Sequence, residues 1–235
     1  MTPLLEVEGI HTAYGTSRVL FGISLDIKPG ECVCLLGRNG VGKTTTMRSI
    51  MGLTPPWQGR VRFKGRDIAG AAPYQLARRG IGYVPEDRRI FADLTVWENL
   101  DVAARSANRA GRWTAESICE LFPKLGELRN RMGGVLSGGE QQMLTIARTL
   151  MGNPELLLLD EPSEGLAPVI VEHLLDQVQR LKRGGLTILL AEQGVDFSLS
   201  LADRVYVLEK GVVRHTGPAD QLRNDAALRE KLLAL

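Results

Sequence analysis

The amino-acid sequence predicts an α/β protein built around a parallel β-sheet. Short apolar segments alternate along the chain with segments of helical periodicity, which is the pattern of strands joined by crossover helices. The apolar segments cover residues 32–36, 155–160, 186–191 and 204–209. A glycine-rich loop at residues 37–44 follows the first of them, and two carboxylates, Asp160 and Glu161, end the second. Because ligands of parallel sheets collect at the carboxyl ends of the strands, both features indicate a site at that edge.

Size and composition are those of an ordinary globular protein. The 235 residues allow one large domain or two small ones, with 44% hydrophobic and 24% charged residues. Because 29 Lys and Arg nearly balance 27 Asp and Glu, the charge predicts no nucleic-acid partner. Glu6 and Glu8 stand where a signal peptide needs an apolar block. No segment approaches the ~20 apolar residues of a membrane-spanning helix, so any membrane role is expected to come through a partner.

The first part of the chain is expected to form strands, a loop and a helix. Apolar residues alternate over residues 19–27 and, more briefly, at Leu5 and Val7, which predicts two half-buried strands. A turn at residues 28–31 then leads into a buried strand at residues 32–36. The glycine loop follows, and after it we expect a helix that starts at Lys43 and ends near residue 51.

The three cysteines are an odd number in a long chain and do not indicate a disulfide framework. Cys32 and Cys34 alternate within an apolar strand, and no His or further Cys lies near them. We therefore predict two buried thiols on one face of the strand, in preference to a metal-binding pair.

The rest of the chain is expected to alternate between helices and strands. Residues 73–135 carry several helical patterns that end at Gly133-Gly134. A further helix begins at Ser137, where Glu140 has the spacing of a capping box, and it stops at residues 152–154. The later elements are helices near residues 168–183 and 195–202, strands at 155–160, 186–191 and 204–209, a hairpin at 210–213 and a helical tail from residue 219.

The loop at residues 37–44 has the composition of a phosphate-binding loop. Gly37, Gly40 and Gly42 let the chain curl so that successive backbone N–H groups point at phosphate oxygens. Lys43 is then expected to reach the outer phosphates, and the Thr44 hydroxyl to bind Mg²⁺. The alternative is an ordinary glycine-rich turn. The buried strand before the loop and the helix after it favour the phosphate-binding interpretation.

Asp160 and Glu161 form the second part of the expected site. They end a strand, residues 156–159, that is apolar on both faces as a central parallel strand should be. Asp160 is expected to hold Mg²⁺ through water, and Glu161 to polarise the water that attacks the γ-phosphate. The alternative is two solvated carboxylates at a strand end. The glycine loop in the same chain favours the functional interpretation over this alternative.

A third motif, Ser137-Gly138-Gly139, opens a helix and can also offer N–H groups and a helix dipole to an anion. Two anion-binding helix ends are hard to bring to one triphosphate within one subunit. They fit a pair of chains in which each glycine loop faces the Ser-Gly-Gly turn of the other. The alternative is a simple capped helix.

Together, the motifs at residues 37–44, 136–142 and 156–161 resemble those of the nucleotide-binding subunit of ATP-binding cassette (ABC) transporters, over almost the whole chain. The resemblance implies a RecA-like P-loop core with a small antiparallel β lobe and an inserted helical lobe at about residues 87–150. All of this would form one ABC ATPase domain, residues 1–235, that binds ATP and Mg²⁺.

The resemblance also extends the expected nucleotide site. Tyr14 falls where the family places an aromatic ring against adenine, the alternative being a tyrosine at a strand edge. Asn39, Thr45 and Glu140 belong to or adjoin the motifs above and are expected at the nucleotide as well.

Three positions depart from the usual family pattern. Glu86 stands where the family has Gln; its carboxylate can still bind Mg²⁺ but, when ionised, cannot donate a hydrogen bond. Ala167 replaces an Asp, so one carboxylate expected at the dimer interface is missing. Gln193 replaces a His; its amide can contact the γ-phosphate but cannot become cationic.

Residues 84–91, 163–168 and 192–193 look similar to the LivF-type ATPases of branched-chain amino acid importers. The resemblance implies a heterodimer with a second ATPase of the LivG type, or a homodimer. It further implies two membrane permease subunits, a periplasmic binding protein and a place on the cytoplasmic face of the membrane. Related importers move urea, short amides or other amino acids, so the solute stays open.

Two other functions are also considered for a chain with these motifs. One is a mechanical ABC ATPase acting on DNA or ribosomes, but residues 44–136 show no sustained heptads of a coiled-coil insertion and the chain carries one cassette. The other is a regulatory cassette that binds ATP without cleaving it. The missing His and Asp allow it, whereas the intact Lys43 and Glu161 argue for hydrolysis.

Overall fold

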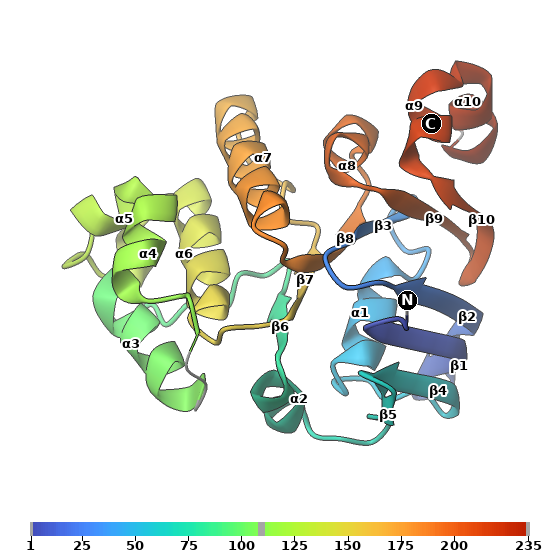
Figure 1. Ribbon diagram of the computed structural model, residues 1–235, viewed down its shortest axis with the longest axis horizontal. Helices are drawn as coiled ribbons and strands as arrows, with labels where there is room; N and C mark the ends of the chain where they lie inside the picture. The colour runs from blue at the N-terminus through green and yellow to red at the C-terminus, as the bar shows by residue number, and fades with distance from the viewer. Residues whose placement is uncertain (1, 108–110, 234–235) are drawn as a thin grey trace.

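A computed structural model describes residues 2–107 and 111–233 and shows two β-sheets of different kinds (Figure 1). The larger has the strand order β10–β9–β3–β8–β7–β6. Its strands are β3 (Cys32–Leu36), β6 (Ile81–Val84), β7 (Leu156–Asp160), β8 (Thr187–Glu192), β9 (Arg204–Glu209) and β10 (Val212–Pro218). All neighbours are parallel except β9 and β10, which form an antiparallel hairpin. The predicted parallel sheet is confirmed.

The smaller sheet is antiparallel, with the order β2–β1–β4–β5. It consists of β1 (Leu5–Tyr14), β2 (Ser17–Ile27), β4 (Gln58–Phe63) and β5 (Arg66–Asp67). The sequence predicted β1 and β2, but it did not single out β4 and β5. In β4 only Val61 and Phe63 are buried, so its alternation is too short to stand out.

Most helices follow the expected pattern. They are α1 (Lys43–Ile50), α2 (Pro73–Arg79), α3 (Val96–Ala107), α4 (Ala115–Leu121), α5 (Pro123–Glu127), α6 (Gly138–Leu150), α7 (Pro168–Arg183), α8 (Val195–Leu201), α9 (Ala219–Asn224) and α10 (Ala226–Leu233). Helices α3 to α6 gather at one end of the molecule (Figure 1). Gly133 and Gly134 do not simply end the region before α6; they form a short 3₁₀ turn, η1 (Gly133–Val135). The helical tail is divided at Asp225.

The larger sheet is buried on both faces, which explains its continuous apolar strands. Cys32 and Cys34 face the core that includes α7 and α8, whereas Val33 and Leu35 face the core shared with α1 and the smaller sheet. The prediction of two buried thiols on one face is therefore confirmed. Burial raises the pKa of Cys32 to about 12, so its thiol stays neutral near pH 7.

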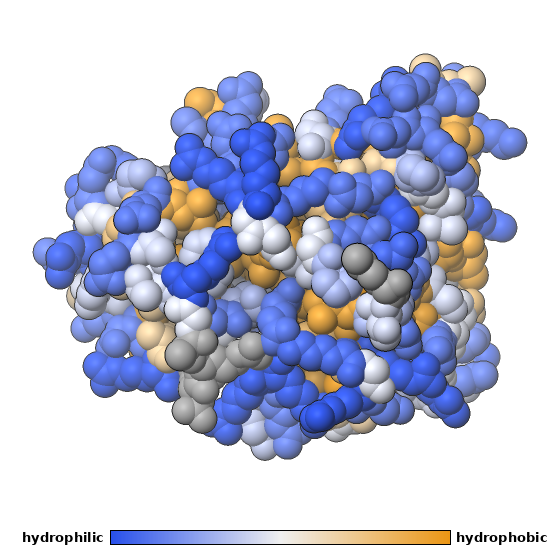
Figure 2. All heavy atoms as spheres, in the orientation of Figure 1, coloured by the Kyte–Doolittle hydropathy of each residue, from blue (hydrophilic) through white to orange (hydrophobic). Residues whose placement is uncertain are grey.

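Hydrophilic residues cover most of the molecular face drawn in Figure 2, and apolar residues show mainly between them. Within residues 2–107 and 111–233, every helix is too short or too polar to span a bilayer. The apolar residues of the described chain thus lie mostly in the two cores on either side of the larger sheet.

The central position of β7 leads to a stability prediction. Leu158 is fully buried between β6 and β8, so Leu158→Ala should lower the free energy of unfolding by about 2–5 kcal/mol, because it leaves a cavity. Val169, which is 56% exposed on α7, is the control. Val169→Ala should change the free energy of unfolding by less than about 0.5 kcal/mol. Urea denaturation measures both; equal losses would contradict this account of the core.

Candidate functional site

The loop between β3 and α1 closes around the ammonium group of Lys43. Nζ donates hydrogen bonds to the carbonyl oxygens of Gly37 at 2.6 Å and Arg38 at 3.0 Å. It also forms an ion pair with Glu161 Oε1 at 3.0 Å. Lys43 is 3% and Glu161 8% exposed, so water screens this pair poorly. The ion pair links the glycine loop directly to the end of β7.

The tight path of the loop depends on glycine at two positions. At Gly37, with φ +154°, a Cβ atom would lie 2.6 Å from the carbonyl oxygen of Leu208 in β9. At Gly42, with φ +110°, it would lie 2.6 Å from a methyl carbon of Leu20 in β2. Both distances are too short for a Cβ atom. Glycine at these two positions therefore lets the loop pack directly against β9 and β2 before it enters α1.

Asp160 is held by two hydroxyl groups from different elements. Thr44 Oγ1 in α1 donates to Oδ1 at 3.0 Å, and the Tyr83 hydroxyl in β6 donates to Oδ2 at 2.8 Å. Burial raises the pKa of Asp160 to about 6 in spite of these two hydrogen bonds, and the negative charges of Glu161 and Glu86 contribute. A carboxylate in such surroundings gains from a nearby cation.

The residues around Asp160 fit a magnesium ion that binds together with phosphate. Among residues 2–107 and 111–233, no group of three or more His, Cys, Asp or Glu could hold a metal alone. Mg²⁺, however, commonly uses one or two carboxylates and takes its other ligands from water and phosphate. The hydroxyl of Thr44 and the carboxylates of Asp160 and Glu86 have this chemistry. Glu86 is exposed just after β6.

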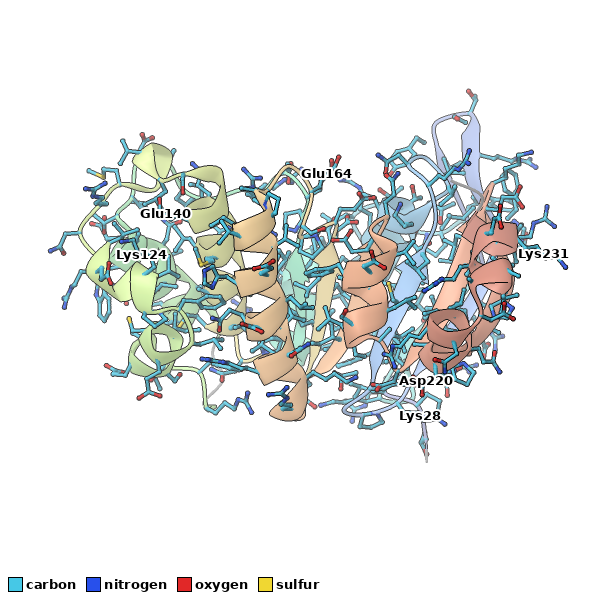
Figure 3. The ribbon with its side chains drawn as sticks, turned by 90° about the horizontal axis from the view of Figure 1, so that it is seen from above. Lys28, Lys124, Glu140, Glu164, Asp220 and Lys231 are labelled. Carbon is cyan, nitrogen blue, oxygen red and sulfur yellow. The ribbon has the colours of Figure 1, made fainter. Side chains whose placement is uncertain are left out.

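Glu161 has an unusual backbone. Its φ is +46°, a left-handed conformation that costs a residue other than glycine about 1–3 kcal/mol. Its N–H donates to the Ala191 carbonyl of β8 at 2.9 Å, and this bond and the Lys43 ion pair hold the conformation. A hydrogen bond with Glu161 raises the pKa of Glu164. Figure 3 places Glu164 at the opposite edge of the molecule from Lys28, which precedes β3.

The loop after β8 brings two more polar residues to this edge. Gln193 is exposed, and its backbone N–H donates to Glu192 Oε2 at 3.1 Å. Glu192 itself is only 2% exposed. Ala191 pairs in register with Asp160. Glu192 and Gln193, which come next in the chain, therefore lie beside the end of β7.

The predicted capping box at the start of α6 is confirmed. Ser137 N–H and Oγ donate to Glu140 Oε2 at 2.8 and 2.9 Å, and Glu140 N–H donates back to Ser137 Oγ at 3.4 Å. The Ser137 N–H bond is the main cause of the lowered pKa of Glu140. A Cβ atom on Gly139 would lie 2.7 Å from Ile170, so α6 packs closely on the start of α7.

The structure brings only part of the predicted site together. Lys43 and Thr44 contact Glu161 and Asp160 directly. In contrast, the turn that begins α6 is separated from α1 by β7 and α7 (Figure 1). The two helix ends that the sequence predicts to bind anions therefore do not meet within one chain.

The remaining predicted residues surround this cluster. Asn39 and Gly40 are exposed in the glycine loop, whereas Thr45 is buried in the first turn of α1. Tyr14, 44% exposed, ends β1. The Thr12 hydroxyl two residues before it bonds to Ser49 of α1 at 2.8 Å, so this end of β1 is fastened to the helix that follows the glycine loop.

Tyr83 was not predicted as a site residue. Tyr83 lies two residues after Ile81 in a short strand, so the sequence could place both side chains on one face. Only the pairing of β6 with β7, however, brings the Tyr83 hydroxyl to Asp160. Glu192 was noted in the sequence only as part of a motif. Glu192 directly follows the apolar residues 188–191, as Asp160 follows the apolar residues 156–159, and that signal could have identified it.

A cavity of about 890 Å³ lies next to the cluster, between α2, β6, α3 and α6. Thr44 and Asp160 border it from the site, and Tyr74, Phe91 and Arg148 line it farther out. Arg148 lies 4.9 Å from the centre of the Phe91 ring. Among the residues that the structure describes, Nη1 of Arg148 is buried without a hydrogen-bond partner.

The raised pKa of Asp160 predicts how stability depends on pH. Its pKa of about 6 in the folded protein exceeds its ordinary value of 3.8, so ionisation destabilises the fold progressively as the pH rises from 4 to 6. Without nucleotide, Asp160→Asn should therefore gain free energy of unfolding relative to wild type over this range, reaching on the order of 1–3 kcal/mol above pH 6. The exposed Asp93→Asn is the control. Urea denaturation from pH 4 to pH 7 measures the difference, and a constant difference would contradict the assignment.

Comparisons with known proteins give the family. A family model described as ABC transporter matches residues 20–164. The branched-chain amino acid transport ATP-binding protein BraG of Pseudomonas aeruginosa is 41% identical over 223 residues, covering 94% of this chain and 96% of BraG. The probable LivF protein of Archaeoglobus fulgidus is 35% identical, covering 93% and 94%. The lipopolysaccharide export protein LptB of Haemophilus influenzae is 34% identical, covering 98% and 97%.

A solved structure supports the same conclusion for the fold. A nucleotide-free ATP-binding cassette from an ABC transporter superposes with a TM-score of 0.85 at 28% identity, covering 98% of this chain and 97% of that one. The α/β fold predicted through the family resemblance is thus confirmed. From its matched family model, its relatives and its fold, this chain belongs to the ABC transporter family, as one of the ATP-binding subunits that hydrolyse ATP.

Proposed function

We propose that this protein drives the uptake of branched-chain or related amino acids, as one ATPase subunit of a membrane importer that uses MgATP. The observation that carries the chemistry is the cluster at the end of β7, in which Lys43 contacts Glu161 and Thr44 contacts Asp160. The amino acid assignment is supported by the 41% identity to BraG.

The glycine loop is the proposed phosphate site. Its backbone N–H groups and the start of α1 would bind the phosphates, with Asn39, Gly40 and Thr45 in the same segment. Lys43 would exchange its bonds to Glu161 and the loop carbonyls for the outer phosphates. This exchange has a consequence for catalysis, because it leaves Glu161 without its cation and free to accept a hydrogen bond from water.

Glu161 is the proposed base for the attacking water. Its left-handed backbone and the bond to Ala191 aim it beyond the end of β7, where the γ-phosphate would lie. Thr44, Asp160 and Glu86 would hold Mg²⁺, which neutralises charge on the phosphate oxygens when bound. Gln193, at the end of the adjacent strand, would sense the γ-phosphate through its amide group.

The site would be completed by a second subunit. The turn at Ser137, Gly138 and Gly139 lies away from the glycine loop of its own chain (Figure 1), so in a facing pair it would meet the nucleotide of the partner. Glu140 would hold this turn through the capping box. Tyr14 would stack on the adenine ring. The partner would be a LivG-like subunit or a second copy of this chain.

The 890 Å³ cavity is the proposed docking site for a cytoplasmic helix of the permease. Tyr74 and Phe91 offer it aromatic surface, and the unpartnered Nη1 of Arg148 offers a hydrogen bond to a carbonyl or carboxylate. Because Thr44 and Asp160 border the same cavity, docking and nucleotide state would be coupled. The chain would thus sit on the cytoplasmic face of the membrane, with a periplasmic binding protein supplying the solute.

A second candidate is an ATPase of lipopolysaccharide export, favoured by the 34% identity to LptB over almost the whole chain. Reconstitution of the protein with candidate permeases separates the two. An importer requires that ATP hydrolysis be stimulated by a binding protein loaded with amino acid. Stimulation by lipopolysaccharide alone would favour the exporter.

Removal of the loop cation tests the phosphate site. Lys43→Ala should lower ATPase activity by at least about 10²-fold, because it deletes a buried charge that compensates the phosphates. The measurement is phosphate release by the protein with its partner subunits. Lys231→Ala is the control: this lysine is exposed on α10, and Figure 3 places it away from Glu140 and Glu164, so activity should stay at the wild-type level. Normal turnover of Lys43→Ala would refute the phosphate assignment.

Replacement of the proposed base tests the shared site. Glu161→Gln should retain ATP binding but stop hydrolysis, since the amide cannot take a proton from water. Closed pairs of subunits should then accumulate with MgATP and be visible by gel filtration. Should only monomers elute with every candidate partner, while ATP binding is intact, the shared site would be wrong.

A further inference from the structure

Glu192 is a buried carboxylate for which the roles proposed above have no use. It ends β8, and its two oxygens accept hydrogen bonds from two different loops. Oε1 accepts the N–H of Ser163 at 3.0 Å and the hydroxyl of Ser163 at 2.6 Å. Oε2 accepts the N–H groups of Gln193 at 3.1 Å and Gly194 at 3.3 Å.

The two loops that Glu192 joins are those with the proposed base and the proposed sensor. Ser163 lies two residues after Glu161, inside a turn in which Glu164 N–H donates to the Glu161 carbonyl at 3.1 Å. Gln193 directly follows Glu192. In addition, Glu192 pairs in register with Leu36, the residue before the glycine loop. One side chain is thus adjacent to three loops of the site.

Burying a carboxylate at this position costs free energy unless its hydrogen bonds compensate for the loss of water. Burial disfavours the charged form and raises the pKa of Glu192, while the hydrogen bonds from Ser163 and Gly194 oppose this effect. The strand pairing of β8 uses backbone groups and does not require the carboxylate. An apolar side chain would, however, leave the N–H groups of Ser163 and Gln193 without their acceptor.

We infer that Glu192 is a positioning residue for ATP hydrolysis, which holds the Glu161 loop and the Gln193 loop in a fixed relation so that both side chains meet one γ-phosphate. The inference rests on the proposed function. Glu192 touches neither phosphate nor water in this role; it acts through Ser163 and the backbone of Gln193.

The test is Glu192→Gln in the complex with its partner subunits. The amide keeps the size of the side chain but replaces one acceptor oxygen by a donor, so one of the two loops loses its bonds. We expect kcat to fall between about tenfold and a hundredfold, since small misplacement of a base has effects of this size. The ATP dissociation constant should change by less than about threefold, because the phosphates bind residues 37–44.

A double-mutant cycle separates this role from a general loss of structure. Ser163→Ala removes one of the four hydrogen bonds and should lower kcat less than Glu192→Gln does. The double variant should be no slower than Glu192→Gln alone, because both changes remove the same connection. Glu209→Gln is the matched control: this exposed glutamate ends β9 and pairs with Arg214, and its replacement should leave kcat unchanged.

Three outcomes would overturn the inference: wild-type kcat in Glu192→Gln, an equal loss of ATP affinity and kcat, or additive effects in the cycle. If Glu192→Gln does not fold, Ser163→Ala alone must still lower kcat at unchanged ATP affinity, and normal kcat would reject the inference. Wild-type protein that fails to hydrolyse ATP with its partners would instead refute the proposed function itself.

Discussion

The buried ion pair between Lys43 and Glu161 is the interaction on which the rest of the site depends. A buried pair of this kind stabilises a protein only when further hydrogen bonds satisfy both charges. Here two loop carbonyls accept hydrogen bonds from Lys43, and a side-chain hydrogen bond joins Glu161 to Glu164. The Ala191 carbonyl also anchors the backbone of Glu161. The pair therefore keeps the glycine loop and the end of β7 in contact while leaving both charges available for a competing ligand. A triphosphate is such a competitor, because it offers Lys43 more negative charge than one carboxylate.

Around this pair the negative charges exceed the positive ones. Asp160 and Glu192 end β7 and β8, and Glu161 and Glu164 follow β7. The pKa values of Asp160, Glu164 and Glu192 are raised by burial or by neighbouring carboxylates. Such an excess disfavours the folded protein without a cation. A bound cation at this edge would offset the excess of negative charge.

The structure shows which groups surround two of the three residues that depart from the usual family pattern. Glu86 contributes to the raised pKa of Asp160, so a carboxylate in place of an amide there adds negative charge near Asp160. Gln193 cannot become cationic, but its backbone is fastened by Glu192. The neutral amide of Gln193 thus extends from a loop whose backbone N–H groups are bound by a buried carboxylate. The substitution at Ala167 lies just before α7 and has no structural explanation within one chain.

The sequence alone determined the order of the parallel strands along the chain, the capped start of α6 and the position of the glycine loop between a buried strand and a helix. These features depend on local periodicity, on glycine spacing and on a capping residue, all of which are written within about ten consecutive residues. Only the tertiary structure decided that Tyr83 reaches Asp160, that Glu192 bridges two loops and that α7 and β7 lie between α6 and α1. Each of these depends on which strands are neighbours and which way a loop turns, and long-range packing decides that. The two weak strands β4 and β5 belong to the same class, because the pairing of β4 with β1 and of β5 with β4, and not their own composition, makes them strands.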